Sequence, residues 1–121
     1  MSFRKGRPVH EMSLCEAVVD IAVEEARKNG AIRIKSVVLE VGALGHVDPN
    51  ALAFCFTAVS HGTLAENARL VIERVAGSGW CLDCAKTVPM SERFGACPVC
   101  GRRHVQMTQG DELRLRELEV E

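Results

Sequence analysis

The sequence predicts an α+β protein with a small three-stranded sheet, two helices and an inserted module that carries four cysteines. Three observations lead to this fold class. Two stretches with helical hydrophobic spacing are each followed by a β-branched stretch, two close cysteine pairs interrupt the pattern, and a last alternating stretch follows them. At 121 residues, 47% hydrophobic and 26% charged, the chain has the length and composition of one globular domain with a small insertion.

The first helix and the first strand are expected within residues 13–41. Ser13 and Glu16 fit a capping box, so we expect the helix to begin near Ser13. Asn29 and Gly30 supply a left-handed stop signal. The β-branched stretch 32–41 then predicts a strand. The apolar residues at helical spacing are Leu14, Cys15, Val18, Val19, Ile21, Ala22 and Ala26.

The second helix has a clear start signal. Asp48 is expected to be its N-cap, with Pro49 in the first helical position, and the helix should stop at residues 61–62. Residues 70–75 predict the strand that follows. The strand–helix–strand order implies two parallel strands joined by a right-handed crossover. The buried stripe of this helix should contain Leu52, Cys55, Phe56 and Val59.

The last strand lies beyond the cysteines. Its apolar residues alternate at positions 113 and 115, and then in the opposite phase at 118 and 120. This change of phase predicts a β-bulge near Arg116 and Glu117. Since one strand alone could not bury its leucines, we expect it to return to the sheet.

The order of elements gives the domain organisation. Residues 9–76 and 107–121 should form one discontinuous α/β domain, and residues 77–106 an inserted module. Residues 1–8 show no structural pattern and are interpreted as an extension.

The inserted module has the spacing of a metal site. Twelve residues separate two Cys-x2-Cys pairs, and each pair can place two sulfurs about 2.3 Å from one tetrahedral ion. Pro98 would stiffen the second pair, and Gly101 permits a positive φ. We therefore predict a structural zinc ribbon whose ligands are Cys81, Cys84, Cys97 and Cys100. The alternatives are iron, a redox dithiol or unbound cysteines.

Composition excludes several classes of function. The formal net charge is −1 and aromatic residues make up 4%, which disfavours binding to nucleic acid or to a membrane surface. The longest uncharged run lies between Asp48 and Glu66 and is interrupted by polar residues, proline and glycine, so no membrane span is expected. Without an export signal, the cysteines indicate a reducing compartment, and we expect a cytoplasmic protein.

Few residues outside the cysteine module indicate a catalytic or metal-binding role. No nucleophile elbow, phosphate-binding loop or zinc-protease motif occurs, so we do not expect an enzyme. Cys15 and Cys55 fall on the predicted buried stripes, where a free cysteine behaves as a small hydrophobe. His10 and Glu11 precede the first helix without a packing role, and imidazole suits Ni(II), Cu(II) or Zn(II).

Several motifs occur in a fixed order along the chain. They are His10-Glu11-Met12-Ser13-Leu14-Cys15, Leu39-Glu40-Val41-Gly42-Ala43-Leu44, Leu52-Ala53-Phe54-Cys55-Phe56, Gly62-Thr63-Leu64-Ala65-Glu66, the four-cysteine ribbon and Gly110-Asp111-Glu112-Leu113-Arg114. Because these motifs occur together and in this order, residues 9–121 resemble the HypA/HybF family of hydrogenase nickel-incorporation proteins.

The resemblance implies a nickel metallochaperone. Such a protein works with a nickel-handling GTPase of the HypB type to load nickel into the large subunit of [NiFe] hydrogenase, and some members assist urease maturation. By position, His10 would be the nickel-binding imidazole, Glu11 its neighbour, and Asp48 an acidic residue near the nickel. The four cysteines match the structural zinc ligands. A homodimer that exchanges the last strand or the ribbon is left open.

The start of the chain departs from the family pattern. In the family the histidine is the second residue, so the terminal amine, a backbone nitrogen and the imidazole can chelate one square-planar nickel ion. Here Val9 occupies the initiator position and eight residues precede it. Either translation begins at Val9 from an alternative start codon, or nickel binds His10 without the amine. We expect the first.

A second class of function competes with nickel transport. The ribbon could serve as a protein-interaction module without any role in metal transfer, with Arg102, Arg103 and His104 as a contact patch. These three residues could equally form a solvated turn. A nickel site no tighter than that of an ordinary surface histidine would favour the interaction module.

Overall fold

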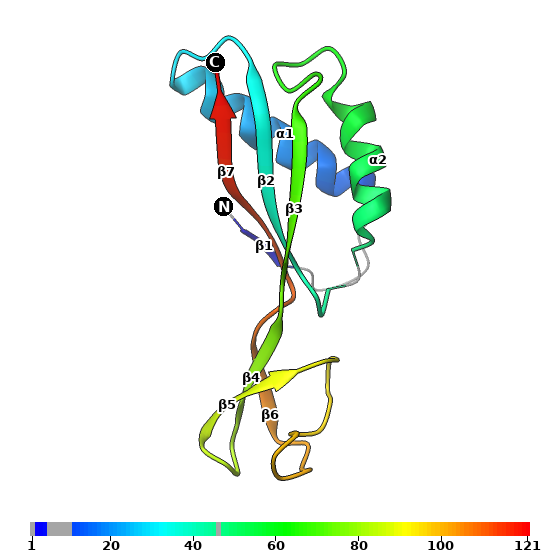
Figure 1. The fold of residues 1–121 in the computed structure, drawn as a ribbon, viewed down its shortest axis with the longest axis vertical. Helices are drawn as coiled ribbons and strands as arrows, with labels where there is room; N and C mark the ends of the chain where they lie inside the picture. Colours follow the sequence, from blue (N-terminus) through cyan, green and yellow to red (C-terminus); the bar gives the residue numbers. More distant parts are fainter. Residues whose placement is uncertain (1, 5–10, 46) are drawn as a thin grey trace.

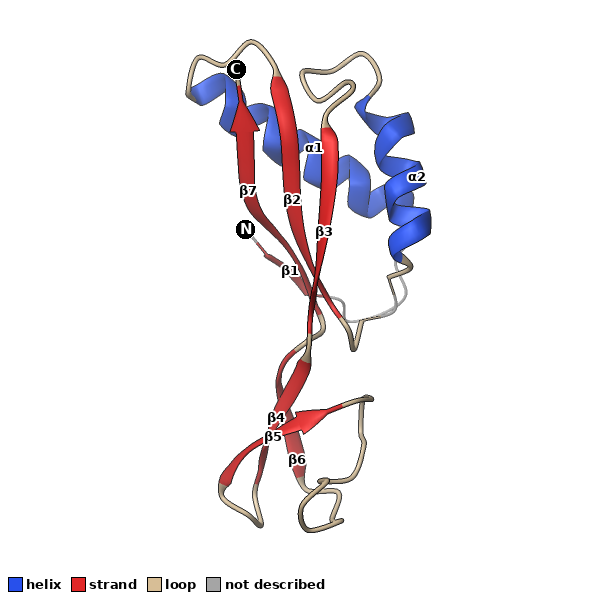
Figure 2. Cartoon of the chain, in the orientation of Figure 1, coloured by secondary structure: helices blue, strands red, loops and turns tan. Residues whose placement is uncertain are grey.

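The computed structural model describes residues 2–4, 11–45 and 47–121, and it contains two sheets joined end to end (Figure 1). The larger sheet has two helices packed on one face, and the smaller sheet carries the cysteine module (Figure 2). Two chain segments join the sheets, one running from β3 into β4 and the other from β6 into β7. The predicted α+β class with an inserted four-cysteine module is confirmed.

Helix α1 (Glu11–Lys28) begins two residues before the expected start. The capping box at Ser13 is therefore not where the helix begins. The acidic Glu11 lies in the first turn, where a negative charge favours the helix N-terminus, so the helix extends past Ser13. The stop signal is confirmed. Gly30 has φ +70°, and Ala31 donates its backbone N–H to the Ala26 carbonyl at 3.0 Å, as in a Schellman motif.

Helix α2 (Pro49–Ser60) begins as predicted. Asp48 is extended, and its carboxylate accepts a hydrogen bond from the backbone N–H of Asn50 at 2.9 Å. Of the expected stripe, Leu52 and Phe56 are buried, while Cys55 and Val59 pack against the core as half-buried residues.

The larger sheet has the strand order β1-β7-β2-β3. Strands β2 (Ile34–Gly42) and β3 (Arg69–Val75) run parallel, and β7 (Glu112–Val120) returns antiparallel to β2, as expected. The bulge is also confirmed. Val38 lies opposite Glu117 and Leu39 opposite Leu115, so Arg116 has no partner in the register.

A fourth strand comes from a segment without a recognisable pattern. Strand β1 (Ser2–Arg4) pairs antiparallel with β7, with Phe3 opposite Leu113. The three expected strands are present, and β1 covers the outer edge of β7 that they would leave open.

The core of this sheet lies between its covered face and the two helices. Alternate residues of β2 point into it, and the opposite face carries ion pairs such as Arg114 with Glu40. The largest fully buried side chains in this core are Ile34, Leu39, Leu52, Val18, Val19, Val37 and Val41. The described part of the chain contains no helix that is long and apolar enough to cross a membrane.

The smaller sheet has the order β5-β4-β6. Its strands are β4 (Gly77–Cys81), β5 (Lys86–Met90) and β6 (Val105–Gln109). The boundary expected after residue 106 falls within β6, because Met107 and Gln109 still pair with β4. The break comes at Gly110, where φ is +113°.

A narrow neck of glycines connects the two sheets. A Cβ atom on Gly77 would lie 2.5 Å from the Leu44 side chain, and one on Gly110 would lie 2.6 Å from the Gly77 Cα. Only glycine lets the two crossing segments approach this closely. The neck therefore fixes where the ribbon leaves the larger sheet.

Candidate metal centre

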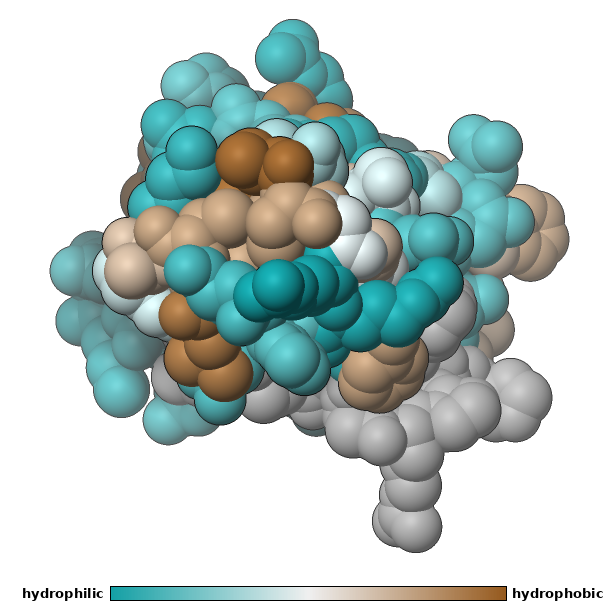
Figure 3. All heavy atoms as spheres, turned by 90° about the horizontal axis from the view of Figure 1, so that it is seen from below, coloured by the Kyte–Doolittle hydropathy of each residue, from teal (hydrophilic) through white to brown (hydrophobic). Residues whose placement is uncertain are grey.

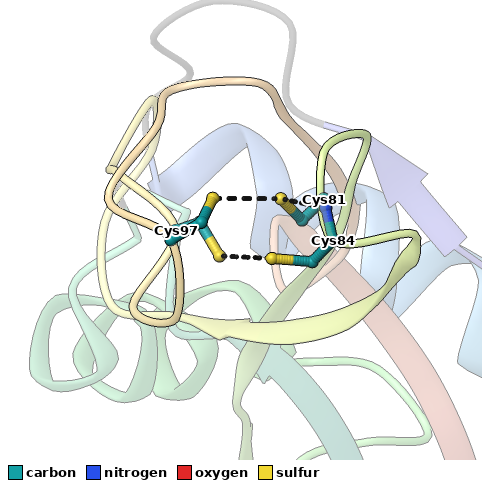
Figure 4. A group of neighbouring side chains, drawn as sticks. Cys81, Cys84 and Cys97 are labelled. Atoms are coloured by element: carbon teal, nitrogen blue, oxygen red, sulfur yellow. Dashed lines mark hydrogen bonds between the residues drawn. The ribbon is translucent and has the colours of Figure 1, made fainter.

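Four thiols converge at the far end of the smaller sheet. The sulfur atoms of Cys81, Cys84, Cys97 and Cys100 all lie within 4.8 Å of one another. The Cys81 and Cys100 sulfurs are 3.7 Å apart, and those of Cys84 and Cys97 are 4.0 Å apart (Figure 4). A tetrahedral thiolate site with metal–sulfur bonds of about 2.3 Å has sulfur–sulfur separations of about 3.8 Å. The spacing therefore fits one tetrahedral ion.

Two equivalent backbone turns hold these thiols. Ala85 donates its N–H to the Cys81 carbonyl, and Gly101 donates to the Cys97 carbonyl, each at 2.8 Å. Both donors have positive φ, +53° for Ala85 and +77° for Gly101. The sequence indicated the second turn through its glycine, whereas nothing about Ala85 signalled the first.

Backbone N–H groups also point at the sulfurs. Cys84 donates to the Cys81 sulfur and Val99 to the Cys97 sulfur, each at 3.4 Å. The N–H groups of Cys100 and Val99 lower the pKa of Cys97 to about 7, whereas burial and the neighbouring thiols raise the pKa of Cys84 to about 12. Four thiolates at this spacing repel one another, and a bound cation is what would let all four deprotonate together.

The site is closed rather than open. Four protein ligands complete a tetrahedron and leave no position for a substrate or water. Among the residues that the structure describes, the surrounding hydrophobic cluster is small: Cys81, Val88 and Cys97 are buried, and Cys84 and Val105 pack against them. A metal ion would therefore supply the stability that this module's core lacks.

A charged cluster lies beside the thiols. The Asp83 carboxylate is 2.8 Å from the His104 ring nitrogen Nδ1 and 3.3 Å from the Arg102 guanidinium. The hydrogen bond to His104, followed by the contacts to Arg102, lowers the pKa of Asp83. All three residues in the predicted patch are thus engaged within the ribbon itself, because Arg103 also donates to the Phe94 carbonyl at 2.9 Å.

The other candidate residues are not part of the four-thiol site. His10 lies outside the described residues. Glu11 is the first residue of α1, and Asp48 caps α2 through its hydrogen bond to Asn50. Cys15 is fully buried, and its thiol donates to the Leu52 carbonyl at 3.2 Å, which agrees with a packing role.

No pattern in the sequence indicated a contact between the ribbon and the larger sheet. Arg93, which lies between the two cysteine pairs, donates to the Leu44 carbonyl at 3.3 Å and to the Asp111 carboxylate at 3.2 Å. Only 5% of the Asp111 side chain is exposed. Arg93 thus connects the loop between the ligand pairs to the glycine neck.

Comparison with known proteins adds to this geometry. Residues 9–120 match the family model described as "HypA: Hydrogenase/urease nickel incorporation, metallochaperone, hypA". The chain belongs to the HypA family. The hydrogenase maturation factor HypA of Rhizobium leguminosarum bv. viciae is 63% identical over 112 residues, which cover 93% of this chain and 99% of that protein. The HypA of Rhodopseudomonas palustris strain TIE-1 is 54% identical over 113 residues, 93% of this chain and 100% of that protein.

Solved structures of HypA proteins have the same fold. The solution structure of the Ni metallochaperone HypA from Helicobacter pylori superposes with a TM-score of 0.70 at 29% identity, covering 93% of this chain and 97% of that chain. A second HypA solution structure gives a TM-score of 0.71 at 29% identity, covering 94% and 98% of the two chains. The resemblance to a nickel metallochaperone family is therefore confirmed.

The HypA match also locates the candidate residues. It begins at Val9, so His10 is the second matched residue, and Glu11, Asp48 and all four ribbon cysteines fall within it. Strand β1 lies ahead of the matched region.

Proposed function

We propose that this chain binds Ni(II) at His10 and delivers it, with a GTPase partner of the HypB type, to the large subunit of [NiFe] hydrogenase. It acts as a metallochaperone rather than as an enzyme. It works in the cytoplasm, where its free thiols stay reduced. The observation that carries the proposal is the family match, which begins at Val9 and so makes His10 the second residue of a nickel-incorporation domain.

The two metals have different sites because the cargo must be released. The four-thiol site is closed, and it takes a structural zinc ion, for which soft thiolates in a tetrahedron are the usual ligands. Nickel instead binds the His10 imidazole, with the neighbouring Glu11, the first residue of α1, beside it in the chain. A site with few ligands can bind nickel and still pass it to a client, whereas a closed thiolate site retains its metal.

The terminal amine is part of the nickel site when the chain starts at residue 9. The amine, a backbone nitrogen and the His10 imidazole then form one square-planar chelate. In the chain that starts at Met1, a carboxylate such as Glu11 or water replaces the amine. The longer chain should therefore bind nickel more weakly. Protonation of the imidazole below a pH of about 6.5 weakens binding in both forms.

Metal analysis with nickel titration tests the proposal. The full chain and a chain that begins at residue 9, with Val9→Met, are purified and analysed for zinc, then titrated with nickel by calorimetry. We expect one zinc per chain in both, and nickel affinity at least about tenfold higher in the shorter chain because it gains a ligand. His10→Ala should lose the nickel site in both forms.

The matched control is His61→Ala, since His61 is an exposed histidine that pairs with Glu66 at the far end of α2. It should leave nickel affinity unchanged. Equal nickel binding by His10→Ala and the parent would contradict the proposal. Equal affinity of the two chain lengths would remove the amine from the site but keep His10.

A further inference from the structure

Among the described residues, the outer edge of β7 is paired over only part of its length. Strand β1 pairs with residues 112–114, and the sheet ends on this side with β1 and β7. No strand of the described chain therefore pairs with the outer edge of residues 117–120. In Figure 1 this stretch is the left side of β7 above β1, and α1 crosses behind it. An unpaired strand edge is a template for one more strand.

The backbone of this stretch directs hydrogen-bonding groups away from the sheet. Glu121 donates its N–H to the Arg33 carbonyl at 2.9 Å, and its own carbonyl accepts the Ile32 N–H at 2.8 Å. Both backbone groups of Glu121 thus point toward the segment that leads into β2. Successive residues of a strand direct these groups to opposite sides. The N–H and C=O groups of Val120 therefore point to the open edge, and so do those of Leu118 two residues earlier.

A groove runs beside this edge on the face of the sheet that the helices cover. It lies between α1 and β7 and has a volume of about 320 Å³. Its apolar lining consists of Ile21, Ala26, Leu115, Leu118 and Val120. At the ribbon end of the molecule, by contrast, exposed apolar groups lie scattered among hydrophilic ones (Figure 3). A strand added at the open edge of β7 would place every second side chain in the groove.

The other face of this edge is acidic. Glu117 and Glu119 alternate with the apolar residues and are exposed on the uncovered face of the sheet. The neighbouring Arg116 is already paired with Glu73. Every antiparallel register that hydrogen-bonds two copies of this edge places glutamates opposite each other, and like charges directly opposite destabilise a sheet. The charge therefore disfavours a second copy and favours a basic strand.

We propose that the edge at residues 117–120 binds an extended segment of a partner protein in which basic and apolar residues alternate. The segment adds to the sheet as an antiparallel strand, as β1 does at residues 112–114. Its basic side chains lie opposite Glu117 and Glu119, and its apolar side chains enter the groove. This binding involves neither His10 nor the four cysteines, so it goes beyond nickel transport and does not depend on it.

Synthetic peptides test this edge directly. The fluorescently labelled peptide acetyl-Val-Lys-Val-Lys-Val-amide is titrated with the full chain in the absence of nickel. We expect saturable binding that is at least about tenfold tighter than that of Val-Glu-Val-Glu-Val, because lysines complement the two glutamates. The peptide Val-Lys-Pro-Lys-Val keeps both charges but lacks the central N–H that would donate to the Leu118 carbonyl. It should therefore also bind at least about tenfold more weakly.

Charge reversal at the edge is the matching test in the protein. The double variant Glu117→Lys/Glu119→Lys should weaken binding of the lysine peptide at least about tenfold and improve binding of the glutamate peptide. The control double variant Glu16→Lys/Asp20→Lys makes the same change of net charge at exposed positions of α1. It should alter the affinity less than about twofold, because distant exposed charges are screened by salt. Equal affinities of the two double variants would contradict the proposal.

Hydrogen exchange measured by NMR shows whether the peptide joins the sheet. Saturating lysine peptide should slow exchange of the Leu118 and Val120 backbone N–H groups at least about tenfold. Absence of saturable binding, equal affinity for the lysine and proline peptides, or unchanged exchange at these two groups would each overturn the proposal. So would sedimentation of the parent as a dimer that Val120→Pro converts to a monomer, because this result would assign the edge to a second copy.

Discussion

Cys15 and Cys97 are both buried thiols, yet their pKa values move in opposite directions. Burial raises the pKa of Cys15 to about 12, and the nearby Cys55 thiol and Glu11 carboxylate add to the shift. Backbone N–H groups lower the pKa of Cys97 to about 7. The Cys15 thiol thus stays protonated in the core, whereas the Cys97 thiol loses its proton more easily and can bind a metal ion.

The Cys15 shift predicts a loss of stability in alkaline solution. The folded pKa lies above the ordinary value of 9.0, so the stabilising contribution is complete below pH 9 and declines as the pH rises toward 12. The free energy of unfolding should fall by about 1 kcal/mol per pH unit above pH 9 from this group. Urea denaturation at pH 8, 9 and 10 would measure the slope.

The comparison with Cys15→Ala isolates this thiol, because that variant should show a shallower slope. Cys55→Ala, which removes the neighbouring cysteine on α2, should keep most of it. Identical slopes in the parent and Cys15→Ala would contradict the assignment.

Helix ends and turns were predicted best where a single residue of a characteristic type, such as glycine after a helix, marks the position. Gly30 ends α1, Asp48 begins α2, and Gly101 forms the second cysteine turn, all as expected. The start of α1 was expected two residues too late, and the Ala85 turn was missed. A helix start can shift by a turn when several acidic or hydroxyl residues compete, and alanine rarely marks a positive φ.

Asp48 has two proposed roles, and substitutions at this position can separate them. Asp48→Ala should lower the free energy of unfolding by about 1 kcal/mol, because α2 loses its cap. Asp48→Ser retains a cap and should restore stability. We expect nickel affinity to stay unchanged in both, since the carboxylate already accepts the Asn50 N–H. Calorimetric nickel titration beside urea denaturation measures the two effects.

A loss of nickel affinity in Asp48→Ser at unchanged stability would instead assign this carboxylate to the nickel site.

Among the described residues, few contacts hold the ribbon and the larger sheet together. The glycine neck sets the path of the chain, and the Arg93–Asp111 pair connects the loop between the ligand pairs to it. Arg93 lies between Cys84 and Cys97. The loop that joins the two pairs of metal ligands is therefore also the loop that attaches the ribbon to the larger sheet.

Arg93→Ala should therefore loosen the ribbon. We expect a loss of about 2 kcal/mol in the free energy of unfolding, because the buried Asp111 carboxylate loses a charged partner. Residual dipolar couplings should also show a wider range of orientations between the two sheets. Arg102→Ala, which breaks an exposed pair with Asp83, is the control and should cost about 0.5 kcal/mol or less. Equal effects of the two substitutions would exclude a special role for Arg93.

The order of the two helices and of strands β2, β3 and β7, the return of β7 with its bulge, and the four-thiol site were determined by the sequence alone. These features depend on hydrophobic period, on glycine and proline positions and on ligand spacing, all of which are local. Tertiary structure alone decided the β1 pairing, the extension of β6 past residue 106, the Arg93–Asp111 contact and the outward position of Phe94. Each of these depends on which distant backbone or side chain lies opposite, and no local pattern encodes that.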